Sequence, residues 1–274
     1  MREAVTPMLS AAGGGAMMEL AAVGERRGEE IVSGSVFARR RGLYSIREGI
    51  LDLLPRGTGT LTPAQWSNLL PPTAWLYERA WRPHAVGLLS RRRIGLDGER
   101  DRLISWLTPR PGLWLDLAAS TGLYGRWLAP HLAAQGAEIV GLDLSFPMLR
   151  EAQQRARSEG IGNISWVRGL AEALPCATDS VSGLVCGGSL NEFGERAPRV
   201  LAEVARVLRP EGRAFFMFLL EAGGAGRAAA RLAEAGGIRF WSRDGAQSLF
   251  QYAGLRLAAY QAHGVVAFAL LHKG

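Results

Sequence analysis

The clearest indication of the fold is the stretch Leu113-Trp-Leu-Asp-Leu-Ala-Ala-Ser-Thr-Gly-Leu-Tyr-Gly-Arg-Trp-Leu128. It opens with an apolar run that ends at Asp116, which is typical of a strand buried on both faces. Small residues follow from Ala118 to Gly122, and a helical pattern then begins at Leu123. A strand, a tight turn and a helix in this order begin a doubly wound α/β fold. Ligands of such folds lie beyond the carboxyl ends of the strands.

A second apolar strand is predicted over residues 137–142, and Asp143 follows it directly. A carboxylate at that place can accept hydrogen bonds from both hydroxyls of a ribose. The small residues of the preceding turn let a ligand approach the backbone, and the new helix offers free N–H groups to an anion. The two signals together predict a nucleoside-containing cofactor. The turn lacks the Gly-x-Gly-x-x-Gly spacing, which argues against a dinucleotide.

The rest of the chain continues the alternation of strands and helices. Further strands are predicted over 163–168, 181–187, 213–220, 255–261 and 265–272, and helices over 145–159, 197–208, 225–235 and 244–253. Because the last two strands follow each other without a helix, they are predicted to form an antiparallel edge. The predicted fold is therefore α/β, with a Rossmann-like seven-stranded sheet, its last strand antiparallel, and helices on both faces.

The first 110 residues divide into three predicted segments. Residues 1–28 are rich in Ala, Gly and Glu without an apolar period, and we expect a flexible tail. Residues 29–56 contain short β-like runs separated by glycines, which predict a small β module that leans on the larger domain. Residues 57–110 predict a helical lid or linker, where Tyr77, Trp81 and His84 are candidates for contact with a substrate.

Composition limits the class of protein. The chain has 274 residues, of which 48% are hydrophobic, and it carries a net charge of +7 with a sequence pI of about 10.2. No apolar run is long enough to span a membrane, and the N-terminus lacks the continuous apolar core of a signal peptide, so a cytoplasmic protein is expected. Arg39-Arg40-Arg41 and Arg91-Arg92-Arg93 are either contacts to RNA phosphates or an anionic substrate, or solvated faces.

The two cysteines, Cys176 and Cys186, give no sign of a metal site. The sequence has neither a Cys-x-x-Cys pair nor a cluster of histidines and cysteines, so zinc and a disulfide framework are not supported. Both residues lie in apolar surroundings and are expected to be core thiols.

Residues 111–274 resemble the class I S-adenosyl-L-methionine (SAM)-dependent methyltransferases, in the type 11 group that includes the ubiquinone/menaquinone C-methyltransferases. Four segments carry the resemblance, in the family's order and spacing: 115–122, similar to Leu-Asp-x-x-x-Gly-x-Gly; 140–149, similar to Val-x-Gly-x-Asp-x-Ser-x-x-Met-Leu; 171–175; and 203–212. Residues 44–54 resemble the last strand of a zinc-ribbon-like module found before some methyltransferase domains. The metal cysteines of that module have no counterpart here.

The resemblance implies SAM as the cofactor and assigns roles to single residues. Asp116 and the backbone of 118–122 would hold the methionine part, Asp143 the ribose, Met148 would pack on the adenine, and Ala171 would offer its backbone N–H to the base. The full set of implied cofactor-binding residues is Asp116, Ala118, Ser120, Thr121, Gly122, Asp143, Leu144, Met148, Leu170, Ala171 and Cys186.

Three positions depart from the family pattern. Ser120 replaces a loop glycine, Leu170 an acidic residue that often binds the adenine amino group, and Ser182 an aspartate of the fourth strand. Ser120 is tolerated in the loop if its φ is negative. The loss of a carboxylate at Leu170 removes one hydrogen bond, a net cost of about 1 kcal/mol.

The sulfonium of SAM is already a strong electrophile, so such an enzyme mainly aligns a nucleophile with the methyl group. A hydroxyl or aromatic carbon also needs a base. Candidates are Asn191 and Glu192, which follow the fourth strand, and Tyr77 and His84 in the lid. We expect a small-molecule acceptor, apolar or aromatic. The alternatives are an enzyme resembling the rRNA guanine methyltransferases, with the arginine clusters binding phosphates, and a protein that keeps the fold without methylating. The oligomeric state stays open.

Overall fold

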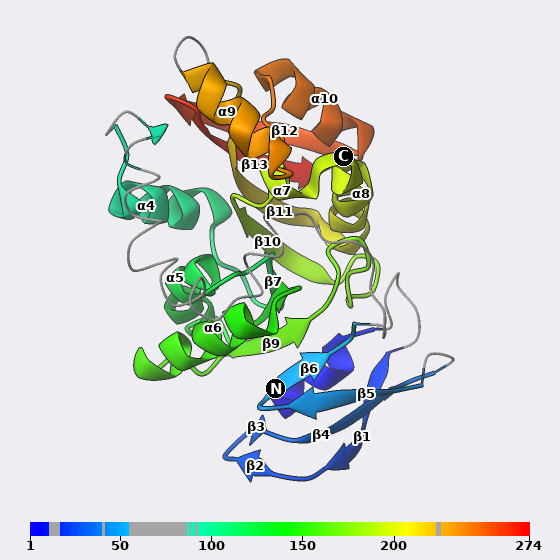
Figure 1. The fold of residues 1–274 in the computed structure, drawn as a ribbon. Helices are drawn as coiled ribbons and strands as arrows, with labels where there is room; N and C mark the ends of the chain where they lie inside the picture. The colour runs from blue at the N-terminus through cyan, green and yellow to red at the C-terminus, as the bar shows by residue number, and fades with distance from the viewer. Residues whose placement is uncertain (11–16, 40–41, 55–86, 88, 91–92, 223–225) are drawn as a thin grey trace.

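The computed structural model describes residues 1–10, 17–39, 42–54, 87, 89–90, 93–222 and 226–274. Most of the predicted lid over 57–110, with Tyr77, Trp81 and His84, lies outside these residues. In the described part, eleven strands form one sheet in the order β1-β4-β5-β6-β9-β8-β7-β10-β11-β13-β12, with helices on both faces (Figure 1).

Seven of these strands form the sheet that the sequence predicts. They are β7 Leu113–Leu117, β8 Glu138–Asp143, β9 Ile164–Arg168, β10 Val181–Gly187, β11 Leu208–Leu219, β12 Leu255–His263 and β13 Val266–Lys273. The strands β7 to β11 run parallel, whereas β13 is antiparallel to both β11 and β12. The direction in which strands are added to the sheet reverses between β7 and β10, and such a reversal opens a crevice at the carboxyl ends of the strands.

Both faces of this sheet are buried. In β7, Trp114 packs in the core under one set of helices and Leu115 in the core under the other, because successive side chains of a strand point to opposite faces. The first set is α4 Leu96–Leu107, α5 Leu123–Ala133 and α6 Phe146–Ser158, and the second is α8 Ala197–Val207 and α10 Arg243–Tyr252. The short segments α7 Leu190–Phe193 and η3 Gly194–Arg196 precede α8, and α9 Gly226–Ala235 precedes α10.

The N-terminal β module is continuous with the large sheet (Figure 1). Its strands are β1 Met18–Val23, β4 Gly34–Ala38, β5 Gly42–Arg47 and β6 Ile50–Asp52, and β2 Arg26–Arg27 pairs separately with β3 Glu30–Ile31. The strand β6 runs parallel to β9, with Leu51 opposite Val167. The predicted sheet of seven strands is therefore smaller than the observed sheet. The N-terminal module adds its strands to the sheet at β9 instead of only packing against the larger domain.

The predicted flexible tail over 1–28 is a second difference. Residues Glu3–Met8 form the 3-10 helix η1, and the side chains of Met1, Val5 and Leu9 are at most 1% exposed. Arg2 forms an ion pair with Glu138 at 3.0 Å. These apolar residues are spaced too irregularly to give a helical or strand period, and their partners lie far away in the sequence, so only the tertiary structure orders them.

None of the helices in the described part of the chain combines the length and the hydropathy needed to cross a bilayer.

Candidate active site

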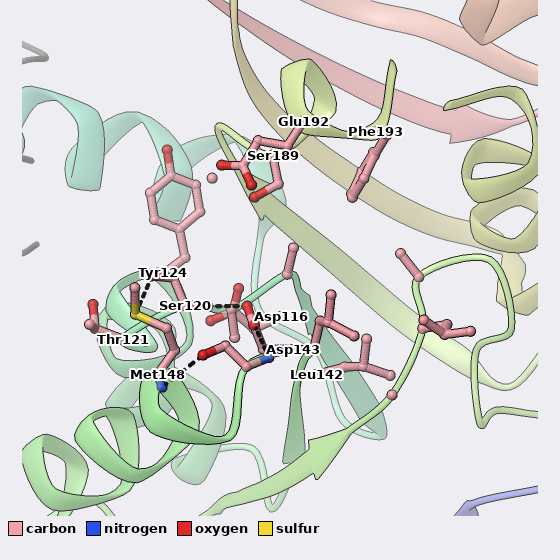
Figure 2. Close-up of a pocket in the computed structure, with 18 of the residues that line it drawn as sticks. Asp116, Ser120, Thr121, Tyr124, Leu142, Asp143, Met148, Ser189, Glu192 and Phe193 are labelled. Atoms are coloured by element: carbon pink, nitrogen blue, oxygen red, sulfur yellow. Dashed lines mark hydrogen bonds between the residues drawn. The ribbon is translucent and has the colours of Figure 1, made fainter. Parts of the chain in front are cut away.

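The loops at the carboxyl ends of β7, β8, β9 and β10 enclose a pocket (Figure 2). Its empty volume is about 1010 Å³, counting the space open to solvent. Both polar and apolar side chains line the pocket, as in pockets that bind small molecules. The predicted residues that line it are Asp116, Ala118, Ser120, Thr121, Asp143, Leu144, Met148, Leu170, Ala171 and Glu192.

The carboxylate of Asp143 is held in one orientation at the end of β8. Its Oδ2 accepts a hydrogen bond from the backbone N–H of Ser120 at 2.7 Å, and its Oδ1 accepts one from Ser145 at 2.8 Å. Burial raises the pKa of Asp143, and the hydrogen bonds from Ser145 and Ser120 oppose that rise. One carboxylate therefore joins the loop after β7 to the loop after β8, and its remaining lone pairs are available to a ligand.

Asp116 lies deeper than Asp143. Its side chain is 2% exposed, and its Oδ2 accepts a hydrogen bond from the backbone N–H of Gly125 at 2.8 Å. Burial raises the pKa of Asp116 to about 8, with the Gly125 hydrogen bond opposing and the charge of Asp143 adding to the rise. In the protein without ligand, burial therefore favours the protonated form of Asp116 near neutral pH, and a cation placed beside it would favour the charged form.

The turn between β7 and α5 is strained at two positions. Ala118 and Ser120 both adopt φ of +52°, in the left-handed region that costs an L-residue roughly 1–2 kcal/mol. The condition of a negative φ, under which Ser120 is tolerated in the loop, is therefore not met. In this backbone conformation the N–H of Ser120 points at the Asp143 carboxylate and donates to it.

Replacing Ser120 with glycine is expected to raise the free energy of unfolding by about 0.5–1 kcal/mol. The gain from relieved strain exceeds the greater backbone freedom that glycine gives to the unfolded chain. Urea unfolding of the purified variant measures this change in the free energy of unfolding. The matched control is Ser105→Gly in α4, where a regular helical backbone predicts a loss of about 0.5 kcal/mol. Destabilisation of both variants by the same amount would contradict strain at Ser120.

Among the predicted site residues that the structure describes, three do not line the pocket. The thiol of Cys186 is fully buried, and burial raises its pKa. Gly122 has φ of +75°, and a Cβ there would lie 2.5 Å from the Trp166 ring, so packing requires this glycine. Asn191 is a structural clamp, because its Nδ2 donates to the Leu219 carbonyl at 2.9 Å and its Oδ1 accepts from the Leu219 N–H at 2.7 Å.

Glu192 lies on the side of the pocket opposite Asp116 and Asp143, together with Ser189 and Phe193 (Figure 2). Burial raises the pKa of Glu192 to about 7, the charge of Asp143 adds to the rise, and Arg196 opposes it. A carboxylate whose pKa lies near neutral pH is suited to general base catalysis.

Several pocket residues were not predicted from the sequence. Tyr124 lines the pocket from the first turn of α5, and its hydroxyl donates to the buried Glu99 of α4. Arg196 lines it too and donates from Nη1 to Glu172 Oε1 at 2.9 Å. The signal for Tyr124 was its place two residues after the turn. The pairing of Arg196 with Glu172 joins two loops that are distant in the sequence and gives no local pattern.

Ser182, which stands where the family pattern has an aspartate, lies away from the pocket. Its hydroxyl donates to the Pro111 carbonyl at 2.9 Å and accepts from Arg209 at 3.1 Å, at the amino end of β10. Among the residues that the structure describes, no three His, Cys, Asp or Glu side chains are placed to hold a metal ion.

Residues 115–212 match the family model described as a methyltransferase domain. The chain is 38% identical over 117 residues to the ubiquinone/menaquinone biosynthesis C-methyltransferase of Dinoroseobacter shibae, covering 42% of this chain and 45% of that protein. It is 39% identical over 119 residues to the malonyl-[acyl-carrier protein] O-methyltransferase of Methylococcus capsulatus, covering 43% of this chain and 42% of that protein. The matches thus span less than half of these curated relatives.

Solved structures share the fold. A chain in the complex of the Haloferax volcanii Trm112 methyltransferase activator with a putative methyltransferase aligns with a TM-score of 0.59 at 14% identity, over 78% of this chain and 99% of that one. Geranyl diphosphate C-methyltransferase from Streptomyces coelicolor, in complex with S-adenosyl-L-homocysteine, aligns with a TM-score of 0.56 at 12% identity, over 65% and 76%. The sequence match and the shared fold together support a SAM-dependent methyltransferase domain in this chain.

Proposed function

We propose that this protein is a SAM-dependent methyltransferase that transfers a methyl group to a small-molecule acceptor, apolar or aromatic in character. The observation that carries the proposal is the oriented carboxylate of Asp143 at the edge of the pocket. The names of both curated relatives described above give small-molecule or carrier-bound acceptors, which supports a small-molecule acceptor.

The residues around the pocket fit SAM. Asp143 would bind the ribose hydroxyls, and the apolar side chains of Met148 and Leu170 would flank the adenine. Asp116 and the backbone of 118–122 would hold the methionine part. When bound, SAM supplies an electrophilic methyl group. The protein's own task is to orient the acceptor opposite that methyl and to exclude water.

Glu192 is the residue that we assign to proton removal from the acceptor. It lies across the pocket from the two aspartates, where an acceptor would meet the methyl group, and it can hold a proton at its carboxylate near neutral pH. Asn191 is not available for this role, because its side-chain amide is hydrogen-bonded to the backbone of Leu219.

A screen of acceptors tests the function. The protein is incubated with SAM and a panel of phenols, quinols, carboxylic acids and ribosomal RNA, and S-adenosylhomocysteine is measured. We expect release with a phenol, quinol or carboxylic acid and none with the Asp143→Ala variant. Release with ribosomal RNA alone would support the guanine-methyltransferase alternative. Tight SAM binding without release from any acceptor would support the non-methylating alternative.

SAM binding is expected to release protons at pH 7. Asp116, whose pKa is raised to about 8 by burial, must lose its proton to pair with the ammonium group of SAM. The affinity should therefore rise from pH 6 to pH 8. Calorimetry in two buffers with different ionisation heats counts the protons. The Asp116→Asn variant, which resembles the protonated form, should lose this release.

The Glu192→Gln variant serves as the control for that measurement, because Glu192 also titrates near pH 7. This variant should still release the proton of Asp116 when SAM binds. Equal proton release by wild type and the Asp116→Asn variant would contradict the assignment of the methionine part to Asp116.

A further inference from the structure

The N-terminal β module meets the large domain beside the candidate cofactor pocket (Figure 1). The strand register places Asp52 of β6 opposite Arg168 of β9, and Arg168 opposite Asp143 of β8. Each of the three strands ends at the residue named. The module therefore ends next to the loops that enclose the pocket, although none of its described residues lines the pocket itself.

The side chain of Arg168 links the module to the loop after β8. Its Nη1 donates to Asp52 Oδ2 at 3.2 Å, and its Nε donates to the Leu144 carbonyl at 3.1 Å. The backbone supports this link, because the N–H of Leu53 donates to the Arg168 carbonyl at 2.8 Å. The side chains of Asp52 and Arg168 are 11% and 27% exposed, so water screens this ion pair less than it screens a surface pair.

Asp52 is itself held in place by its own module. Its Oδ2 also accepts a hydrogen bond from Arg47 Nη2 at 2.6 Å, and its Oδ1 accepts one from the backbone N–H of Leu54 at 3.2 Å. The guanidinium of Arg47 also lies 5.7 Å from the centre of the Phe146 ring, in the first turn of α6. The carboxylate of Asp52 is therefore a fixed anchor for Arg168.

The peptide group between Leu144 and Ser145 connects Arg168 to the Asp143 carboxylate. Its carbonyl accepts the hydrogen bond from Arg168, and its N–H donates to Asp143 Oδ1 at 2.8 Å. A trans peptide group is planar, and its C=O and N–H point in opposite directions. A hydrogen bond that fixes the direction of the carbonyl therefore also fixes the direction of the N–H that orients Asp143.

We propose that Asp52 and Arg168 are positioning residues of the cofactor site. Asp52 holds Arg168, Arg168 holds the peptide group between Leu144 and Ser145, and that peptide group orients Asp143 toward the ribose. The N-terminal module thereby contributes to cofactor affinity without touching the cofactor. The inference rests on the proposed function, since it needs a ribose at Asp143. An ion pair with only a structural role would change the stability of the protein but not its preference for a ribose with hydroxyls.

Two ligands and two variants test the proposal. The ligands are S-adenosylhomocysteine and its 2′,3′-dideoxy analogue, which lacks the hydroxyls that Asp143 would bind. Replacing Arg168 with methionine should weaken S-adenosylhomocysteine binding about tenfold, the size of one hydrogen bond. Replacing Asp52 with asparagine removes only the anchoring charge and should weaken it about threefold. The dideoxy analogue should bind both variants within about twofold of its affinity for wild type. Calorimetry, by direct and competitive titration, measures the affinities.

The matched controls are Arg2→Met and Glu138→Gln. Arg2 pairs with Glu138 at 3.0 Å and donates to the Gly162 carbonyl at 2.8 Å, and the two side chains are 24% and 13% exposed. This pair has the same chemistry and burial as Asp52 with Arg168, but it lies at the amino end of β8, away from the pocket. Both controls should bind S-adenosylhomocysteine within about twofold of wild type. Urea unfolding of each variant shows whether its stability has changed.

Unchanged binding of S-adenosylhomocysteine by Arg168→Met would overturn the proposal. Equal weakening of both ligands by that variant, or equal weakening by the controls, would overturn it too. If Arg168→Met does not fold, the comparison of the two ligands with Asp52→Asn decides. A wild type that binds no S-adenosylhomocysteine would contradict the proposed function, and this inference with it. Normal binding by wild type and by both Asp52 and Arg168 variants would overturn this inference alone.

Discussion

Replacing Asp143 with alanine is expected to weaken SAM binding at least about 100-fold. Two hydrogen bonds from the ribose hydroxyls to a charged carboxylate contribute about 1.5–3 kcal/mol each, and about 1.4 kcal/mol corresponds to a factor of ten in affinity. The same change leaves the backbone N–H groups of Ser120 and Ser145 without their acceptor. We therefore also expect the free energy of unfolding to fall by about 1–3 kcal/mol, without loss of the fold.

Calorimetry with SAM measures the affinity, and urea unfolding measures the stability. The matched control is Asp101→Ala, which removes a carboxylate from the exposed face of α4 and should change neither quantity appreciably. Unaltered SAM binding by a folded Asp143→Ala variant would show that the ribose lies elsewhere.

Replacing Glu192 with glutamine is expected to lower kcat by about 10²–10⁴-fold for an acceptor whose proton must be removed, because positioned general bases contribute in that range. SAM affinity should change much less. The pH–rate profile should lose the ionisation near pH 7, since burial sets the pKa of Glu192 at about 7. Steady-state kinetics between pH 5.5 and 9 measures all three quantities.

The control for Glu192 is Glu172→Gln, a carboxylate that lines the same pocket but pairs with Arg196. It should keep the ionisation near pH 7 and most of kcat. If Glu192→Gln retained both the rate and the pH profile of wild type, proton removal would belong to another group.

Much of the α/β domain could be predicted because its signals are local. The strand over 181–187 is found at Val181–Gly187, and the helix over 197–208 at Ala197–Val207. Ser145 caps α6 as a side-chain acceptor of the Met148 N–H, with Pro147 in the first turn. Periodicity and capping act within one or two turns of chain, so one sequence suffices to detect them.

The N-terminal part could not be predicted to the same depth. The order of residues 1–28 depends on burial of Met1, Val5 and Leu9 against distant parts of the chain, and the pairing of β6 with β9 joins segments more than 100 residues apart. The pattern of residues 44–54 resembled a strand of a known module, but nothing local could tell which strand of the domain it would pair with.

In the candidate site, too, some residues could be predicted from local signals and others could not. Asp116 and Asp143 were predicted because each follows an apolar strand, and both line the pocket. Asn191 and Glu192 are neighbours in the sequence and looked equivalent there. The structure separates them, since Asn191 binds the Leu219 backbone and Glu192 faces the pocket. Which of two adjacent polar side chains points inward depends on the turn of α7, which four residues are too few to reveal.

A crystal structure of the protein with S-adenosylhomocysteine would show directly where the ribose binds. We expect both ribose hydroxyls to lie within hydrogen-bond distance of the Asp143 carboxylate, at the carboxyl ends of β7 and β8, with the adenine against Met148. A ligand bound elsewhere, or a ribose without contact to Asp143, would show that this pocket is not the cofactor site.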